Sequence, residues 1–156
     1  MRPRYALPVI MFMSLALASC GGDGTGPELP ALNGSMTAVI DGVSWSATTA
    51  LTAAESGGIL GFAGSDASNV TIGMAFVLDG TGTYPIGPSI PTNATYTDGS
   101  SAQWSADPFN GSGSITVTTL TSDHAVGTFS FVMEPDAGNS ATGSVTITAG
   151  TFDVTF

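Results

Sequence analysis

The fold is decided by the stretch Val70-Thr71-Ile72-Gly73-Met74-Ala75-Phe76-Val77-Leu78. From Val70 to Leu78, every second residue is a large apolar one. Successive side chains of a β-strand point to opposite faces, so these alternating positions would line one face. The stretch therefore predicts a strand with one face buried in a core.

Similar short runs, rich in Val, Ile, Thr and Phe, recur through residues 35–156 and are separated by Gly, Asp, Asn and Pro. Besides 70–78, the runs predicted to be strands are 36–40, 43–47, 47–55, 59–63, 115–120, 126–133, 145–148 and 152–156. No window keeps a 3.6-residue apolar period, which predicts little helix. Eight or nine short strands in one domain predict an all-β fold, a single antiparallel β-sandwich or a barrel.

Turn signals support this interpretation. Asp41-Gly42, Asp79-Gly80 and Asp98-Gly99 are expected to form hairpin-type turns, because Asp and Gly tolerate positive φ.

A short internal repeat occurs in the last third of the chain. Gly-Ser-Ile-Thr-Val-Thr at 113–118 returns as Gly-Ser-Val-Thr-Ile-Thr at 143–148. Each copy is followed by Gly-Thr-Phe, at 127–129 and at 150–152. The spacing differs between the copies, which predicts two similar antiparallel strand pairs rather than a solenoid.

The N-terminal residues have the pattern of an export signal. A basic start, Met1 to Arg4, precedes the apolar stretch from Tyr5 to Ala18. As a helix this stretch would span about 21 Å, less than the roughly 30 Å hydrocarbon core, which favours a signal peptide over a permanent membrane span. Residues 1–19 are predicted to be the signal peptide, 20–34 a flexible tether rich in Gly, Pro and polar residues, and 35–156 the all-β domain.

The end of this segment, Leu17-Ala18-Ser19-Cys20, resembles the lipobox of bacterial lipoproteins. The resemblance implies cleavage before Cys20, a diacylglyceryl thioether on its sulfur, and acylation of the new N-terminus. Cys20 is the only cysteine, so no internal disulfide competes for it. Several acyl chains anchor a protein stably in a membrane. By resemblance to the sorting rules of Gram-negative bacteria, Gly21 points to the outer membrane.

Most of the charged residues are acidic. The sequence has 2 Lys+Arg and 12 Asp+Glu, and its formal net charge is −10. Both cations, Arg2 and Arg4, lie in the predicted signal peptide, so cleavage changes the charge from −10 to −12, that is −10 − 2. Nucleic acid is not expected as a partner, because binding phosphates requires basic side chains.

A second resemblance covers residues 36–156. Met36 to Ala47 contains Asp41-Gly42 followed by Trp45, and this Asp-Gly-x-x-Trp motif resembles the start of an uncharacterised bacterial lipoprotein family. The resemblance continues at Gly82-Thr83-Tyr84, at 127–131 and at 150–154. It implies a class and a location, and it transfers no catalytic residue.

Candidate catalytic chemistry is sparse. His124 is the sole histidine and lies in a polar turn, and no serine has a Gly-x-Ser-x-Gly setting, so no catalytic residue is assigned. A zinc site is not expected, because zinc needs nitrogen or sulfur ligands and the chain has one histidine and one cysteine. Calcium is a possible but less favoured partner, through oxygens of the loops 107–114 and 134–140. No metal site and no cofactor are predicted.

The aromatic residues give the remaining indication of a ligand. Trp45 alternates with Val43 and is expected in the core. Tyr96 and Trp104 flank the Asp98-Gly99 turn, where they either pack against each other across a hairpin or form an exposed pair, which is the candidate binding site. The sequence thus predicts a non-enzymatic, lipid-anchored binding or structural module for a carbohydrate or protein ligand. The alternatives are a carboxylate-dependent hydrolase and a lipocalin-like carrier of an apolar ligand.

Overall fold

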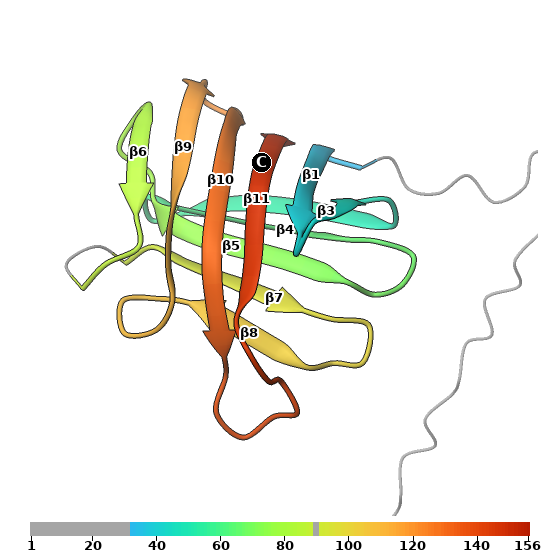
Figure 1. The fold of residues 1–156 in the computed structure, drawn as a ribbon. Coiled ribbons are helices and arrows are strands. Elements are labelled where there is room, and N and C mark those ends of the chain that lie inside the picture. Colours follow the sequence, from blue (N-terminus) through green and yellow to red (C-terminus); the bar gives the residue numbers. More distant parts are fainter. Residues whose placement is uncertain (1–31, 89–90) are drawn as a thin grey trace, which may run out of the picture.

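The computed structural model describes residues 32–88 and 91–156, and within these residues it contains eleven β-strands and no helix (Figure 1). The strands are β1 (Gly34–Ile40), β2 (Val43–Ser46), β3 (Ala50–Ser56), β4 (Ile59–Ser65), β5 (Thr71–Val77), β6 (Gly82–Pro85), β7 (Asn93–Thr97), β8 (Gln103–Ala106), β9 (Ser112–Leu120), β10 (His124–Pro135) and β11 (Val145–Thr155). All pairings between them are antiparallel, which confirms the predicted all-β fold.

The strands form one sheet that curls into a half-barrel with two facing halves (Figure 1). The first half has the order β6-β9-β10-β11-β1-β2, and the second has the order β8-β7-β5-β4-β3. The long strand β10 belongs to both, because it pairs with β9 and β11 along most of its length while its last residues, Glu134 and Pro135, pair with β8. Figure 1 shows the strands of the second half running across those of the first.

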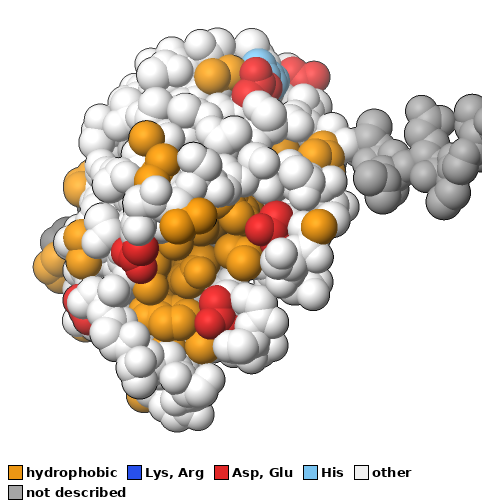
Figure 2. Space-filling model, turned by 45° about the vertical axis from the view of Figure 1, so that its right-hand side comes forward, with side chains coloured by type: hydrophobic (Ala, Val, Ile, Leu, Met, Phe, Trp, Pro, Cys, Tyr) orange, Lys and Arg blue, Asp and Glu red, His pale blue; other side chains and the backbone are white. Residues whose placement is uncertain are grey.

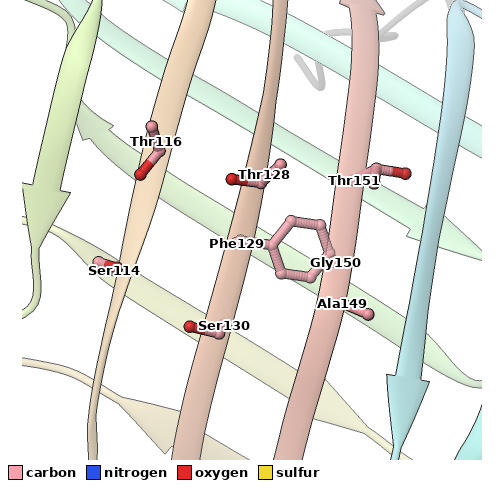
Figure 3. A pocket seen from close by; sticks show the side chains of 8 residues that line it. All are labelled: Ser114, Thr116, Thr128, Phe129, Ser130, Ala149, Gly150 and Thr151. Carbon is pink, nitrogen blue, oxygen red and sulfur yellow. The ribbon is translucent and has the colours of Figure 1, made fainter.

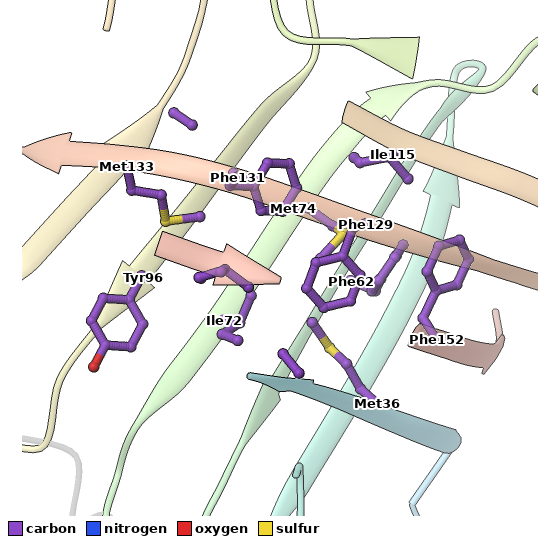
Figure 4. Close-up of a cluster of buried hydrophobic side chains, with 14 of the residues drawn as sticks. Met36, Phe62, Ile72, Met74, Tyr96, Ile115, Phe129, Phe131, Met133 and Phe152 are labelled. Carbon is purple, nitrogen blue, oxygen red and sulfur yellow. The ribbon is translucent and has the colours of Figure 1, made fainter. Parts of the chain in front are cut away.

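The core fills the space between the halves (Figure 4). In β5, Ile72, Met74 and Phe76 are buried, as the alternation predicted. Phe62 of β4 meets Phe152 of β11, with ring centroids 4.8 Å apart, so aromatic contact joins the two halves directly. Rings at such separations pack favourably in addition to the area they bury.

The two Gly-Thr-Phe segments lie opposite each other on β10 and β11. Gly127 pairs with Phe152, and Phe129 pairs with Gly150, so each glycine faces the other segment's phenylalanine. A Cβ at Gly150 would come within 2.4 Å of the Phe129 ring. Each ring thus occupies the space that a side chain on the opposite residue would need, and only glycine fits there.

This arrangement corrects one prediction about the repeat. The stretch 113–118 does pair with β10, as expected. The stretches 143–148 and 150–152, however, do not form a pair, since residues from 145 onward lie in the single strand β11. Both copies of the repeated stretch instead flank β10, one on either side.

Other differences are local. β1 begins at Gly34, one residue before the predicted start of the domain, and Leu32 packs against the core. Asp41-Gly42 and Asp98-Gly99 form hairpin turns, whereas Asp79-Gly80 connects β5 to β6, which do not pair. The strand count rises to eleven because β6, β7 and β8 are too short to show an apolar period.

The predicted signal peptide, Cys20 and most of the tether lie outside the described residues. Within the part of the chain that the structure does describe, no helix is long and apolar enough to cross a membrane.

Candidate functional site

Tyr96 and Trp104 pair as cross-strand neighbours on β7 and β8, with ring centroids 5.3 Å apart. Cross-strand packing is therefore the correct alternative, and the exposed pair is wrong, since the two residues are only 9% and 7% exposed. Trp104 packs into the core edge, and its Nε1 donates a hydrogen bond of 2.8 Å to the Gly143 carbonyl. Tyr96 differs, because it also lines a hollow that opens to solvent.

This hollow has a volume of about 310 Å³, and its lining comes from the β1–β2 hairpin, the β4–β5 connection and β7. Its apolar walls come from different strands and loops of the chain: Ile40, Val43, Trp45, Val70 and Tyr96. Two carboxylates, Asp41 and Asp66, also line it. Figure 2 shows a hydrophobic hollow on this side of the molecule, with acidic side chains around it and no Lys or Arg in view. We call it the acid-rimmed pocket.

The carboxylates at the rim are fixed by hydrogen bonds to backbone N–H groups. Asp41 Oδ1 accepts from Thr146 N at 2.8 Å. Asp66 Oδ1 accepts from Ser68 N and Val70 N at 2.8 and 3.0 Å. In both residues the bonds reach Oδ1 only, so within the described residues Oδ2 has no protein donor and is left for solvent or a ligand.

A third carboxylate, Asp98, belongs to the same group. Its Oδ1 accepts from Ser100 Oγ, Ser100 N and Ala102 N at 2.8 to 2.9 Å. The pKa of Asp98 is lowered by these bonds, first of all the one from the Ser100 hydroxyl, while partial desolvation opposes the shift. Asp98 is therefore ionised at neutral pH, as a carboxyl with an ordinary pKa would also be.

The three carboxylates act together on Tyr96. The pKa of the Tyr96 hydroxyl is raised above 10.0, first by burial and then by the negative charges of Asp98, Asp41 and Asp66. Both causes disfavour a phenolate. The hydroxyl of Tyr96 therefore reports on the electrostatic potential in the acid-rimmed pocket.

This gives a prediction for alkaline solution. The folded state holds the Tyr96 proton more tightly than the unfolded chain, so its contribution to stability is complete below about pH 10 and is lost as the pH rises through the raised pKa. In Asp41→Asn, which keeps an oxygen acceptor for Thr146 N, Tyr96 should titrate at lower pH than in the wild type. The measurement is the tyrosinate absorbance, with the Tyr96→Phe titration subtracted. Glu55→Gln is the control, and an unchanged titration in Asp41→Asn would contradict the prediction.

Trp45 forms part of the pocket wall and explains the Asp-Gly-x-x-Trp motif. Asp41 forms two hydrogen bonds with Thr146 in β11. Its backbone N donates to Thr146 O at 2.9 Å, and its side chain accepts the bond from Thr146 N described above. Gly42 follows at φ 86°, and the turn directs Trp45 inward, where the indole packs over Gly64. Its expected burial is confirmed at 7% exposure, whereas Val43 stays 68% exposed at the pocket.

The indole of Trp45 has an unusual feature. Its Nε1 is buried and has no hydrogen-bond partner among the described residues. Most buried polar groups in native proteins are paired, so such a group calls for an explanation. Trp45 itself belongs both to the core cluster and to the lining of the acid-rimmed pocket.

A larger but different hollow, of about 440 Å³, lies on the outer face of the first half (Figure 3). Threonines in register on neighbouring strands form this face, among them Thr116, Thr128 and Thr151. Thr151 Oγ1 is 2.8 Å from Thr37 Oγ1, so these two hydroxyls form a hydrogen bond with each other. No charged residue lines this hollow, and its cross-strand pairs have a structural explanation.

Two further groups of polar residues bear on the chemistry predicted from sequence. His124 Nε2 lies 2.7 Å from Asp153 Oδ1 on the surface, and no serine hydroxyl of the described residues bonds to the imidazole. Asp107 and Asp136, from the two loops considered for calcium, converge on Ser105 Oγ at 3.3 and 2.5 Å. A carboxylate-dependent hydrolase needs two carboxylates that face one substrate bond, whereas these two face a hydroxyl of the protein itself.

Ser105, between these two carboxylates, is only 8% exposed, and neither carboxylate lines the acid-rimmed pocket or the hollow of Figure 3. Residues 32–88 and 91–156 contain no group of three or more His, Cys, Asp and Glu side chains that could hold a metal ion.

Sequence reasoning singled out Tyr96 but missed Asp41, Asp66 and Val70 as its neighbours in a site. Asp41 and Asp98 were recognised only as turn residues. The signal available in the sequence was that acidic residues open turns in a domain without Lys or Arg to pair with them.

Comparisons with known proteins give a family and no activity. A family model described as "Domain of unknown function (DUF6252)" matches residues 32–154, which is nearly the whole of the described part. No curated protein and no solved structure matches the chain.

Proposed function

The chain belongs to the family described as domain of unknown function DUF6252, and from this premise we propose that it is a lipid-anchored binding domain of the bacterial cell envelope. Its ligand site is the acid-rimmed pocket. Cys20 carries the lipid and places the domain at the outer membrane.

One observation carries the binding role: an open hollow of about 310 Å³ combines two aromatic walls with fixed polar groups at its rim. Ligand sites are mostly apolar hollows of at least this size with a few placed polar groups. The interior of the half-barrel is filled by side chains that pack on one another, which favours a surface site over the alternative of an internal carrier. The converging pair Asp107 and Asp136 supports the hydrolase alternative less well, because the hydroxyl between them is nearly buried.

The binding role is tested by a thermal-shift screen of the full chain in non-ionic detergent against sugars, lipids, amines and calcium. A ligand at a hundred times its Kd stabilises the folded state by about 2.7 kcal/mol, which raises Tm measurably. Val43→Trp should abolish the shift, because Val43 is an exposed wall residue and an indole there fills the hollow. Ile59→Trp is the matched control, an exposed apolar residue at the far end of β4.

Two results would end the binding proposal. One is a screen in which no compound of any charge shifts Tm. The other is a shift that Val43→Trp leaves intact.

The anchor gives a separate prediction. Replacing Cys20 by alanine is expected to abolish lipid attachment and release the chain from the membrane fraction, because no other thiol is available for a thioether. The measurement is radiolabelled palmitate incorporation together with fractionation of the cells. Ser14→Ala, in the apolar stretch, should keep the label. Mass spectrometry that finds an intact Met1 or an unmodified Cys20 in the wild type would contradict the anchor.

A further inference from the structure

We propose that the acid-rimmed pocket takes a small organic cation, an ammonium or guanidinium group on an apolar body. This inference rests on the binding role proposed above and adds the chemical class of the ligand.

The first argument is that no lysine or arginine of the domain compensates its negative charges. The domain has no Lys or Arg, since the only two, Arg2 and Arg4, precede Cys20. Asp41 and Asp66 line the hollow beside Tyr96, and Asp98, in the β7–β8 turn two residues after Tyr96, adds a third negative charge nearby. A cation bound there would be attracted by all three carboxylates at once.

The second argument concerns how that charge is held. Each carboxylate uses Oδ1 for its own turn or strand and leaves Oδ2 without a protein donor in the described residues. The backbone bonds fix the carboxylates before any ligand arrives, which lowers the entropy lost on binding. Asp41 and Asp66 line a hollow of about 310 Å³, and the described residues form no metal-holding cluster of three or more such side chains. A group larger than a metal ion fits that arrangement.

The third argument is the apolar wall. Trp45 and Tyr96 supply aromatic surface, and Ile40, Val43 and Val70 supply aliphatic surface in the same hollow. A cation close to aromatic rings gains cation–π attraction, and quaternary ammonium groups are often recognised in this way. A fully hydrated inorganic cation would leave these walls unused.

Anions and neutral ligands fit less well. A carboxylate or phosphate would be repelled by three fixed negative charges, and no side-chain cation is available to offset them. A neutral ligand could bind the walls and donate hydrogen bonds to the rim, but it would gain no attraction between opposite charges.

The experiment compares three probes that share a benzyl body: benzyltrimethylammonium, benzyl alcohol and phenylacetate. Binding to the full chain in non-ionic detergent is followed by the fluorescence of Trp45 and Trp104. We expect the cation to bind at least about tenfold more tightly than the alcohol, and phenylacetate to bind more weakly than both. The preference should shrink as salt is added, because screening weakens exposed charges.

The variants remove charge and keep the hydrogen bonds. In Asp66→Asn and Asp41→Asn, the amide oxygen can still accept from the backbone N–H, so the turns should persist. Each variant is expected to raise the Kd of the cation about threefold and to leave the Kd of the alcohol unchanged. Glu55→Gln is the matched control, since Glu55 Oε1 accepts from Gly58 N at 2.7 Å in the same way but lies at the opposite end of β4.

The ionisation of Tyr96 shows whether the cation binds beside this residue. Benzyltrimethylammonium should lower the pH at which Tyr96 ionises, because a fixed positive charge stabilises the phenolate. The change must be absent in Tyr96→Phe. Circular dichroism of each variant shows that the fold is retained.

Three results would overturn the inference. The first is equal affinity for the cation and the alcohol, which would leave the binding role intact and remove only its charge preference. The second is a cation affinity that Asp66→Asn and Asp41→Asn do not change. The third is a lysine-containing peptide that binds more than tenfold more tightly than the quaternary probe, because the recognised group would then belong to a protein partner.

Discussion

Phe129→Ala is expected to lower the free energy of unfolding by about 3–5 kcal/mol, as for other buried phenylalanines. Phe129 is 4% exposed, and its ring covers Gly150 on β11 while it stacks on Phe131, with centroids 5.6 Å apart. Gly150→Ala alone should cost about 1–3 kcal/mol, because its Cβ would come within 2.4 to 2.6 Å of three atoms of that ring.

The two substitutions should not be additive. The nearest atoms to a Cβ at Gly150 all belong to the Phe129 ring, so Phe129→Ala removes the whole conflict. In that background Gly150→Ala is expected to cost nearly nothing, and the coupling energy should reach about 1–3 kcal/mol. Urea unfolding of the wild type, both single variants and the double variant measures it. Ser130→Ala is the control partner, because Ser130 is exposed next to Phe129 on the strand. Additive costs for Gly150→Ala and Phe129→Ala would contradict the reciprocal packing.

Gly127→Ala is expected to be the more damaging of the two glycine substitutions, with a cost above about 3 kcal/mol. Its Cβ would lie 2.0 Å from the backbone carbonyl oxygen of Thr116 and 2.5 Å from the Phe152 ring. The Phe152 ring can be removed by substitution. The Thr116 carbonyl belongs to the pairing of β9 and β10, so it cannot move without breaking that pairing. With a total stability of about 5–15 kcal/mol for a domain, this loss would be a large share.

A second double-variant cycle, with Gly127→Ala and Phe152→Leu, distinguishes Gly127 from Gly150. Phe152→Leu removes the aromatic ring and leaves the Thr116 carbonyl in place, so it should rescue little of the Gly127→Ala cost. Urea unfolding measures this cycle as well. Strong rescue by Phe152→Leu would show that the ring, and not the backbone, sets the requirement for glycine at 127.

Both predictions concern the strands that hold the pocket in shape. β11 carries Gly150 and Phe152, and it also carries Thr146, whose N–H fixes the Asp41 carboxylate. We therefore expect variants that loosen the pairing of β10 and β11 to weaken ligand binding even when the pocket residues are unchanged. The effect should follow loss of stability, whereas Asp41→Asn should weaken cation binding with the fold retained.

Local patterns in the sequence were sufficient for much of the fold. The alternation from Val70 to Leu78 predicted the buried face of β5, because a strand's period of two is set by its own backbone. Asp41-Gly42 predicted a hairpin for the same kind of reason, since the two residues adopt φ values of 46° and 86°. The absence of Lys and Arg after residue 4 makes the domain anionic whatever shape the chain adopts, because net charge depends on composition alone.

The tertiary structure alone decided where those parts meet. Asp98 follows Tyr96 by two residues, and Asp66 lies in the turn before β5, which pairs with β7. Asp41 joins them only because the sheet curls and brings the end of β1 to the second half. The burial of Tyr96 and Trp104 was likewise invisible in their own hairpin, because it depends on β10 passing from one half of the sheet to the other. Local sequence sets which face a side chain takes, but long-range strand pairing sets what that face meets.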